Sequence, residues 1–129
     1  MGFVACAAAF LLGCARSAPP VIVVVRPPSR AVWADANAAR TWPSAGAAFV
    51  SRGHGVGNYD VDVRVAPPNL QRYRALTPGR TLPVGAVIAA FHRDRATGAA
   101  ASTYVMTKRG PDDWKFAVAN PSGQLLQGK

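Results

Sequence analysis

The sequence predicts a mainly β protein of the α+β class, an antiparallel meander sheet with one or two short helices. Its 129 residues include 12 glycines and 11 prolines, and frequent turn-forming residues favour short elements. Residues 59–65 (YDVDVRV) alternate apolar and polar side chains, as a half-buried strand does. Three further strand-like stretches, at 86–92, 102–108 and 114–118, are separated by short turn-rich segments. Consecutive strands joined by short turns form an antiparallel meander.

The N-terminal residues predict an export signal. Residues 3–12 are a nearly unbroken apolar run. About 20 apolar residues are needed to cross a bilayer, so a run of this length is typical of a signal-peptide core instead. Leu11-Leu12-Gly13-Cys14 follows, and it resembles the lipobox of bacterial lipoproteins. The resemblance implies cleavage before Cys14 and attachment of acyl chains to it, which would hold the protein on a membrane.

This signal divides the chain into three parts. We expect a signal peptide at 1–13, a lipidated tether at 14–30 and one β-rich domain at 31–129. Ala15, directly after the cysteine, implies by the same resemblance the outer membrane, with the domain on the periplasmic side. No positively charged residue precedes the apolar run, although signal peptides usually have one. The alternative is therefore a buried N-terminal helix of a cytosolic protein.

The charge of the chain is strongly positive. Lys and Arg number 15 against 6 Asp and Glu, which gives a net charge of +9. A protein this basic can bind nucleic acid, anionic lipid or an acidic partner. The charges are scattered along the sequence, and no basic cluster alternates with aromatic residues. We therefore expect no nucleic-acid partner, and a membrane partner through the lipid anchor.

The other predicted elements are short. Residues 21–25 (VIVVV) are rich in β-branched side chains but lie between two proline pairs, which favours an extended edge segment. Residues 31–42 are alanine-rich and are followed by Pro43, so they predict one short helix. The prolines at the start of 67–73 open a second helical turn.

Alternation within the strands predicts the core. Residues at every second position of a strand point to the same side of the sheet, so the large apolar side chains of neighbouring strands should meet. We expect one shared core against one face, made of Val61, Val63, Val87, Val105, Trp114, Phe116 and Val118.

Few residues carry recognisable chemistry. His54, His92 and a carboxylate such as Asp60 are residue types that bind metals, but a metal site usually needs three or four converging ligands. A hydrogen-bonded or surface histidine is the default expectation. Residues 53–57 (GHGVG) lead into a strand and not a helix, so they do not predict a phosphate-binding loop. Asp60 and Asp62 lie on one face of a strand and are expected to face water beside Arg64. No catalytic, metal-binding or cofactor-binding residue is predicted.

Aromatic side chains gather in the last two predicted strands. Tyr104, Met106, Trp114 and Phe116 occupy alternating positions there. Such side chains most often belong to a core. The face that they line is also one on which a flat apolar ligand could sit.

Six short motifs follow one another between residues 51 and 123. Their order and spacing resemble the cytochrome P-460 family, whose members are periplasmic β-sheet proteins that carry a c-type haem. The resemblance implies hydroxylamine oxidation or nitric oxide binding. The motifs are SRGH at 51–54, VRVAP at 63–67, LPVGAV at 82–87, YVMTKR at 104–109, DWKF at 113–116 and NPSG at 120–123.

The residues that would hold this haem are missing. The family attaches haem c through a C-x-x-C-H motif after the closing tryptophan strand, and no cysteine follows Cys14 here. The lysine that crosslinks the haem in the family would fall near Ala90, and Phe91 stands where a glutamate is expected. We therefore expect no cofactor in this chain. Either it is a truncated or degenerate relative of that family, or it is a non-enzymatic lipoprotein that binds a partner or a small ligand.

We predict that Cys14 carries the lipid. A bacterium that expresses the full chain and is fed labelled palmitate should transfer the label to the protein. Cys14→Ser should lose the label because it lacks the acceptor thiol. Cys6→Ser is the matched control and should label like the wild type, since Cys6 lies inside the predicted signal peptide. Equal labelling of the wild type and Cys14→Ser would contradict the prediction.

Overall fold

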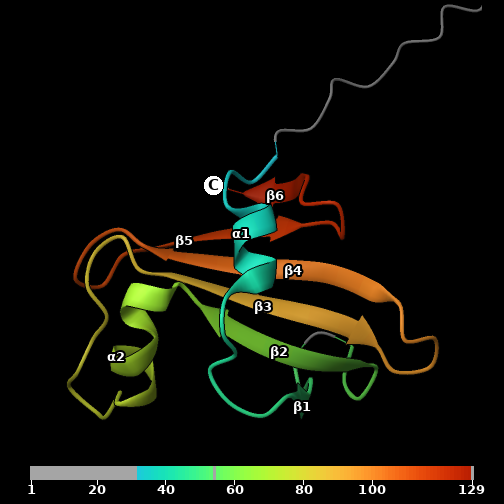
Figure 1. Ribbon diagram of the computed structural model, residues 1–129, viewed down its shortest axis with the longest axis horizontal. Helices are drawn as coiled ribbons and strands as arrows, with labels where there is room; N and C mark the ends of the chain where they lie inside the picture. Colours follow the sequence, from blue (N-terminus) through green and yellow to red (C-terminus); the bar gives the residue numbers. More distant parts are fainter. Residues whose placement is uncertain (1–31, 54, 129) are drawn as a thin grey trace, which may run out of the picture.

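Six antiparallel strands form a sheet in the order β1-β2-β3-β4-β5-β6 (Figure 1). The computed structural model describes residues 32–53 and 55–128. Each strand pairs with the next one along the chain, so the sheet is a meander and the predicted fold class is confirmed. The strands are β1 (Phe49–Val50), β2 (Tyr59–Val65), β3 (Val87–Asp94), β4 (Ala100–Lys108), β5 (Trp114–Ala119) and β6 (Leu125–Gly128).

Two short helices accompany the sheet. Helix α1 (Ala36–Thr41) lies across one face of it, in front of β3 and β4 in Figure 1. Helix α2 (Leu70–Arg74) lies beyond the end of β2 and follows a 3-10 turn at Pro67–Asn69, as the proline pair predicts. Within the described residues, no helix is long and apolar enough to cross a membrane.

The strand register sorts the side chains onto two faces. Residues that pair across antiparallel strands point to the same side of the sheet. We call the side beneath α1 the covered face and the opposite side the aromatic face. The covered face carries Asp60, Asp62, Arg64, Ala89, Phe91, Thr103, Val105, Ala117 and Ala119. The aromatic face carries Tyr59, Val61, Val63, Val65, Ile88, Ala90, His92, Tyr104, Met106, Trp114, Phe116 and Val118.

Small residues let α1 approach the covered face closely. Ala36 and Ala39 are the buried residues of the helix, and Ala89 is buried on the strand side. Gly123 lies so near that a Cβ atom added to it would be 2.5 Å from the Cβ of Ala36. The Gly123 carbonyl also accepts a hydrogen bond of 2.9 Å from the Trp33 amide. Helix and sheet are therefore joined at a contact that leaves no room for a larger residue.

The prediction of one shared core is wrong. The register places Val87 and Val105 on the covered face, whereas the other five predicted residues lie on the aromatic face. Phe116 is even 59% exposed. Alternation shows which residues share a face, but it does not show which face a helix will cover. The buried apolar residues are mostly small: Ala36, Ala39, Val61, Val65, Leu70, Leu82, Ala86, Ala89, Val105 and Ala119.

Three elements differ from the sequence predictions. The helix expected at 31–42 begins only at Ala36, because Val32 forms an isolated bridge with Gln124 instead. Strands β1 and β6 were not predicted, since two and four residues are too few to show an alternating pattern.

Several sequence predictions fall outside the described residues. They concern the signal peptide at 1–13, the tether at 14–30 with Cys14, the segment 21–25 and His54.

Candidate functional site

His92 and Asp60, two of the three residues considered for a metal site, lie on opposite faces of the sheet. His92 lies on the aromatic face, where its ring contacts those of Tyr59 and Tyr104, at centroid distances of 5.8 and 4.8 Å. Asp60 lies on the covered face, opposite Arg93. Within 32–53 and 55–128, no group of three possible ligands is found. His92 and Asp60 therefore do not converge on one metal ion.

His92 fits the hydrogen-bonded alternative of the default expectation, a hydrogen-bonded or surface histidine. It is only 6% exposed, and its Nδ1 atom lies 3.2 Å from the carbonyl oxygen of Ala90. That distance fits the tautomer in which Nδ1 carries the proton and donates to the carbonyl. The imidazole is held by its neighbours on the sheet.

The four aromatic and sulfur side chains singled out in the sequence do meet. Met106 pairs with Phe116 across β4 and β5, and the neighbouring pairs place Tyr104 and Trp114 on the same face. Three of them, Tyr104, Trp114 and Phe116, line a broad cavity of about 530 Å³. Its lining residues are Tyr104, Arg109, Asp113, Trp114, Lys115, Phe116, Ala117, Val118, Gln127 and Gly128.

A buried lysine holds one wall of this cavity. Lys108 pairs with Trp114 across the strands, and its Nζ atom lies 4.9 Å from the centroid of the Trp114 ring. The same ammonium donates a hydrogen bond to the Pro111 carbonyl. A cation over an aromatic face is attracted by the ring quadrupole, so the lysine fixes the tryptophan in place.

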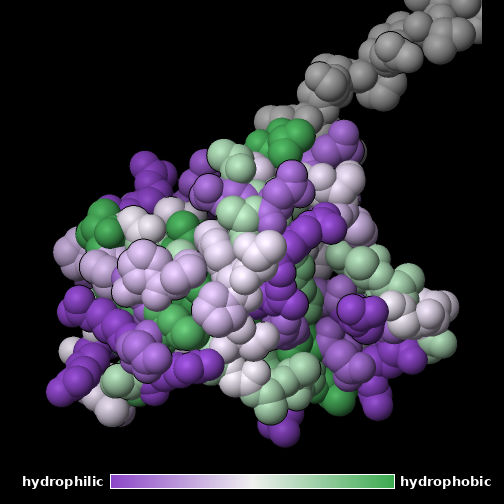
Figure 2. Space-filling view, viewed as in Figure 1, coloured by the Kyte–Doolittle hydropathy of each residue, from purple (hydrophilic) through white to green (hydrophobic). Residues whose placement is uncertain are grey.

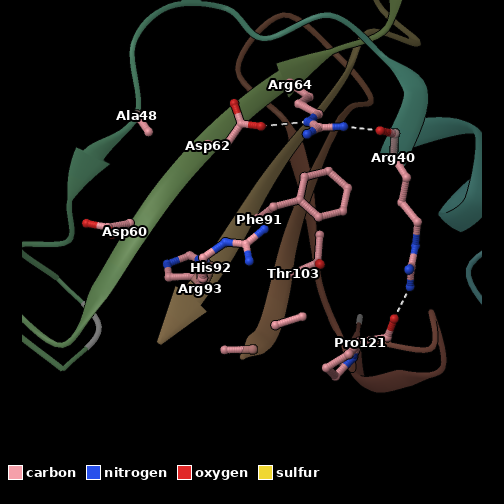
Figure 3. Close-up of a pocket in the computed structure, with 12 residues that line it drawn as sticks. Arg40, Ala48, Asp60, Asp62, Arg64, Phe91, His92, Arg93, Thr103 and Pro121 are labelled. Carbon is pink, nitrogen blue, oxygen red and sulfur yellow. Dashed lines mark hydrogen bonds and ion pairs between the residues drawn. The ribbon is translucent and has the colours of Figure 1, made fainter. Parts of the chain in front are cut away.

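A second, smaller cavity of about 260 Å³ opens on the covered face beside the end of α1 (Figure 3). Phe91 and Thr103, paired on β3 and β4, form its floor. Arg40, Arg64 and Arg93 stand around it. The sequence pattern does not predict this cavity, because Arg40 lies on a helix that is far from β3 and β4 in the sequence.

An ion-pair network fixes one side of the smaller cavity. Ser44 Oγ donates a hydrogen bond of 2.6 Å to the Asp62 carboxylate, and Arg64 Nε donates one of 2.7 Å. The Arg64 guanidinium also donates to the Arg40 carbonyl of α1 and lies 5.1 Å from the Phe91 ring centroid. Asp62 therefore lies beside Arg64, as expected, and its side chain is 25% exposed and held by hydrogen bonds from Ser44 and Arg64.

The environment of Asp62 lowers its pKa. Partial burial alone would raise the pKa, but the hydrogen bonds from Ser44 and Arg64 and the positive charge of Arg64 outweigh it. The carboxylate thus stays ionised at neutral pH and keeps Arg64 in place. Asp60 forms a looser pair with Arg95, at 3.3 Å, and both side chains are about half exposed.

The described residues do not fit a covalently bound haem of the P-460 type. Ala90, near which the P-460 resemblance would place a crosslinking lysine, is a methyl group between Val63 and Tyr104 on the aromatic face. Phe91, at the position of the expected glutamate, points to the other side of the sheet. No family model, curated protein or solved structure matches this chain.

We predict that Asp62 contributes to stability in a pH-dependent way. Because its pKa is lower in the folded state, the contribution is complete above the unfolded value of about 3.9 and is lost as the pH falls through the lowered folded value. Asp62→Asn keeps the shape but not the charge. Its deficit in unfolding free energy, measured by urea denaturation, should be largest near pH 7 and should shrink towards pH 2.

Asp112→Asn is the matched control, because Asp112 is an exposed aspartate. Its unfolding free energy should follow the wild-type pH dependence. An Asp62→Asn deficit that stays constant from pH 7 to pH 2 would show that the carboxylate plays no electrostatic part.

Proposed function

We propose that this protein is a bacterial envelope lipoprotein whose domain binds a flat apolar ligand on its aromatic face. Cys14 would anchor it on the periplasmic side of the outer membrane, as the lipobox resemblance implies. The observation that carries the ligand class is the cavity of about 530 Å³ that Tyr104, Trp114 and Phe116 line.

The chemistry of the cavity favours a planar, apolar molecule. Rings and aliphatic side chains dominate its wall, and aromatic side chains stack well against flat rings. Phe116 is 59% exposed although its partner on β4 is Met106. A ligand lying on this surface would remove it from water, at about 25 cal/mol per Å² of apolar area buried. The gain requires no rearrangement of the sheet.

Polar groups at the edge of the cavity could orient such a ligand. Gln127 on β6 and the Tyr104 hydroxyl provide donors and acceptors. Arg109 and Asp113 form an exposed ion pair of 3.8 Å at the rim. Ligand pockets commonly combine an apolar wall with a few polar groups of this kind.

The P-460 resemblance suggests a haem protein, and a haem is itself flat and largely apolar. The side chains at 90 and 91 supply neither the amine nor the carboxylate of that family. We therefore propose noncovalent binding without redox catalysis. The domain would act as a carrier or receptor at the membrane surface.

We predict that the detergent-solubilised full chain binds metal-free protoporphyrin, with quenching of its tryptophan fluorescence. Trp114 lines the cavity, whereas Trp33 and Trp42 contact each other, with 6.2 Å between ring centroids. Phe116→Ala should weaken binding by about tenfold, which corresponds to about 1.4 kcal/mol of lost contact. Trp114→Phe should remove most of the quenching.

Phe49→Ala is the matched control, because Phe49 is 52% exposed on the same face but at the far edge of the sheet. It should bind like the wild type. Equal affinity of Phe116→Ala and Phe49→Ala would contradict the proposed site. The chain should also stay unstained for haem on a denaturing gel after expression with c-type maturation proteins. A stained band would favour the haem enzyme instead.

A further inference from the structure

The geometry points to a second binding site, on the covered face, for a small aromatic carboxylate. The site is the cavity between the end of α1 and strands β2 to β4. Figure 3 shows Phe91 in its middle, with the side chains of Arg40 and Arg93 on either side. The inference is independent of the proposed ligand of the aromatic face, because the sheet separates the two cavities.

The charges around this cavity leave two arginines available. Arg64 forms an ion pair with Asp62, and Asp60 forms one with Arg95. Arg40 and Arg93 each donate to a backbone carbonyl, of Pro121 and of Gly98 respectively. Within 32–53 and 55–128, no ion pair joins either of these two arginines to a carboxylate.

These two arginines retain donors for an anion. A guanidinium has five N–H donors in a planar fork, and a single carbonyl bond uses one of them. A carboxylate matches this fork because it can accept two parallel hydrogen bonds. The charges of Asp62 and Asp60 are balanced by Arg64 and Arg95. Arg40 and Arg93 therefore give the cavity an excess of positive charge.

The rest of the cavity is apolar and small. Phe91 supplies a ring at the floor, with the Arg64 guanidinium over it at 5.1 Å from the centroid. The remaining apolar wall consists of Ala48, Ala100, Ala101 and Pro121. An apolar cavity of about 150 Å³ holds benzene. A volume of about 260 Å³ therefore admits one aromatic ring with a carboxylate attached.

Structural elements hold the site open. Ser44 and Asp62 fix Arg64, and Arg64 in turn donates to the Arg40 carbonyl at the end of α1. Thr103, only 6% exposed, pairs with Phe91 at the floor. Because these contacts fix the side chains around the cavity, little side-chain ordering remains for binding.

Benzoate is the probe, titrated into the detergent-solubilised full chain and followed by ¹H–¹⁵N NMR. The amide signals of Phe91 and Thr103 should shift in a saturable way, while those of Met106 and Phe116 on strands β4 and β5 should shift less. Acetate tests whether the ring is needed, and benzylamine tests whether the negative charge is needed. Both should bind at least about tenfold more weakly than benzoate, since acetate lacks the aromatic ring and benzylamine lacks the carboxylate.

Arg93→Gln removes one anchoring cation and should weaken benzoate binding by about tenfold. Arg72→Gln removes the same charge from α2, outside the cavity, and should leave the affinity unchanged. Arg40→Gln provides a second variant if Arg93→Gln fails to fold. No saturable shift with benzoate, equal binding of benzylamine, or equal affinities of Arg93→Gln and Arg72→Gln would overturn the inference.

Discussion

Helix α1 rests on the sheet at a contact that only small side chains permit. Ala36 on the helix and Gly123, just before β6, are so close that a single added methyl group would collide. This approach brings Arg40, at the end of the short helix, next to the polar side chains of β2. A six-residue helix covers only part of one face, so the sheet keeps an open rim around the helix. Figure 2 shows the covered side, where polar and apolar side chains are mixed around the helix.

The two faces consequently differ in chemistry. Beneath and beside α1, charged residues of β2 and β3 form ion pairs around a central phenylalanine. On the other side, rings of β4 and β5 stand next to one another, with His92 packed between two tyrosines. The register produces this division, because a shift of one residue in any strand would exchange its two sets of side chains. A basic chain can thus carry an apolar binding surface on one side and an anion-binding cavity on the other.

The meander and four of its six strands could be predicted from the sequence, because their alternation and their turn residues are local signals. The grouping of Tyr104, Met106, Trp114 and Phe116 on one face could be predicted for the same reason. The residues of the core could not be predicted. Alternation separates the side chains of a strand into two sets, but it does not show which set lies beneath α1. The smaller cavity could not be predicted either, since Arg40 and Phe91 are far apart in the sequence and line the same cavity only through tertiary packing. The isolated bridges and the two edge strands involve too few residues to leave a pattern.

The contact between α1 and Gly123 can be tested by comparing two glycines with the same φ angle. Gly123 and Gly85 both have φ of +87°, but only Gly123 has a neighbour within 4 Å of an added Cβ. Alanine at either position incurs the left-handed strain of roughly 1–2 kcal/mol. We predict that Gly123→Ala lowers the unfolding free energy, measured by urea denaturation, by about 1–3 kcal/mol more than Gly85→Ala does, because the added methyl group overpacks the contact. Equal losses for the two variants would contradict the close contact on which both faces of the sheet depend.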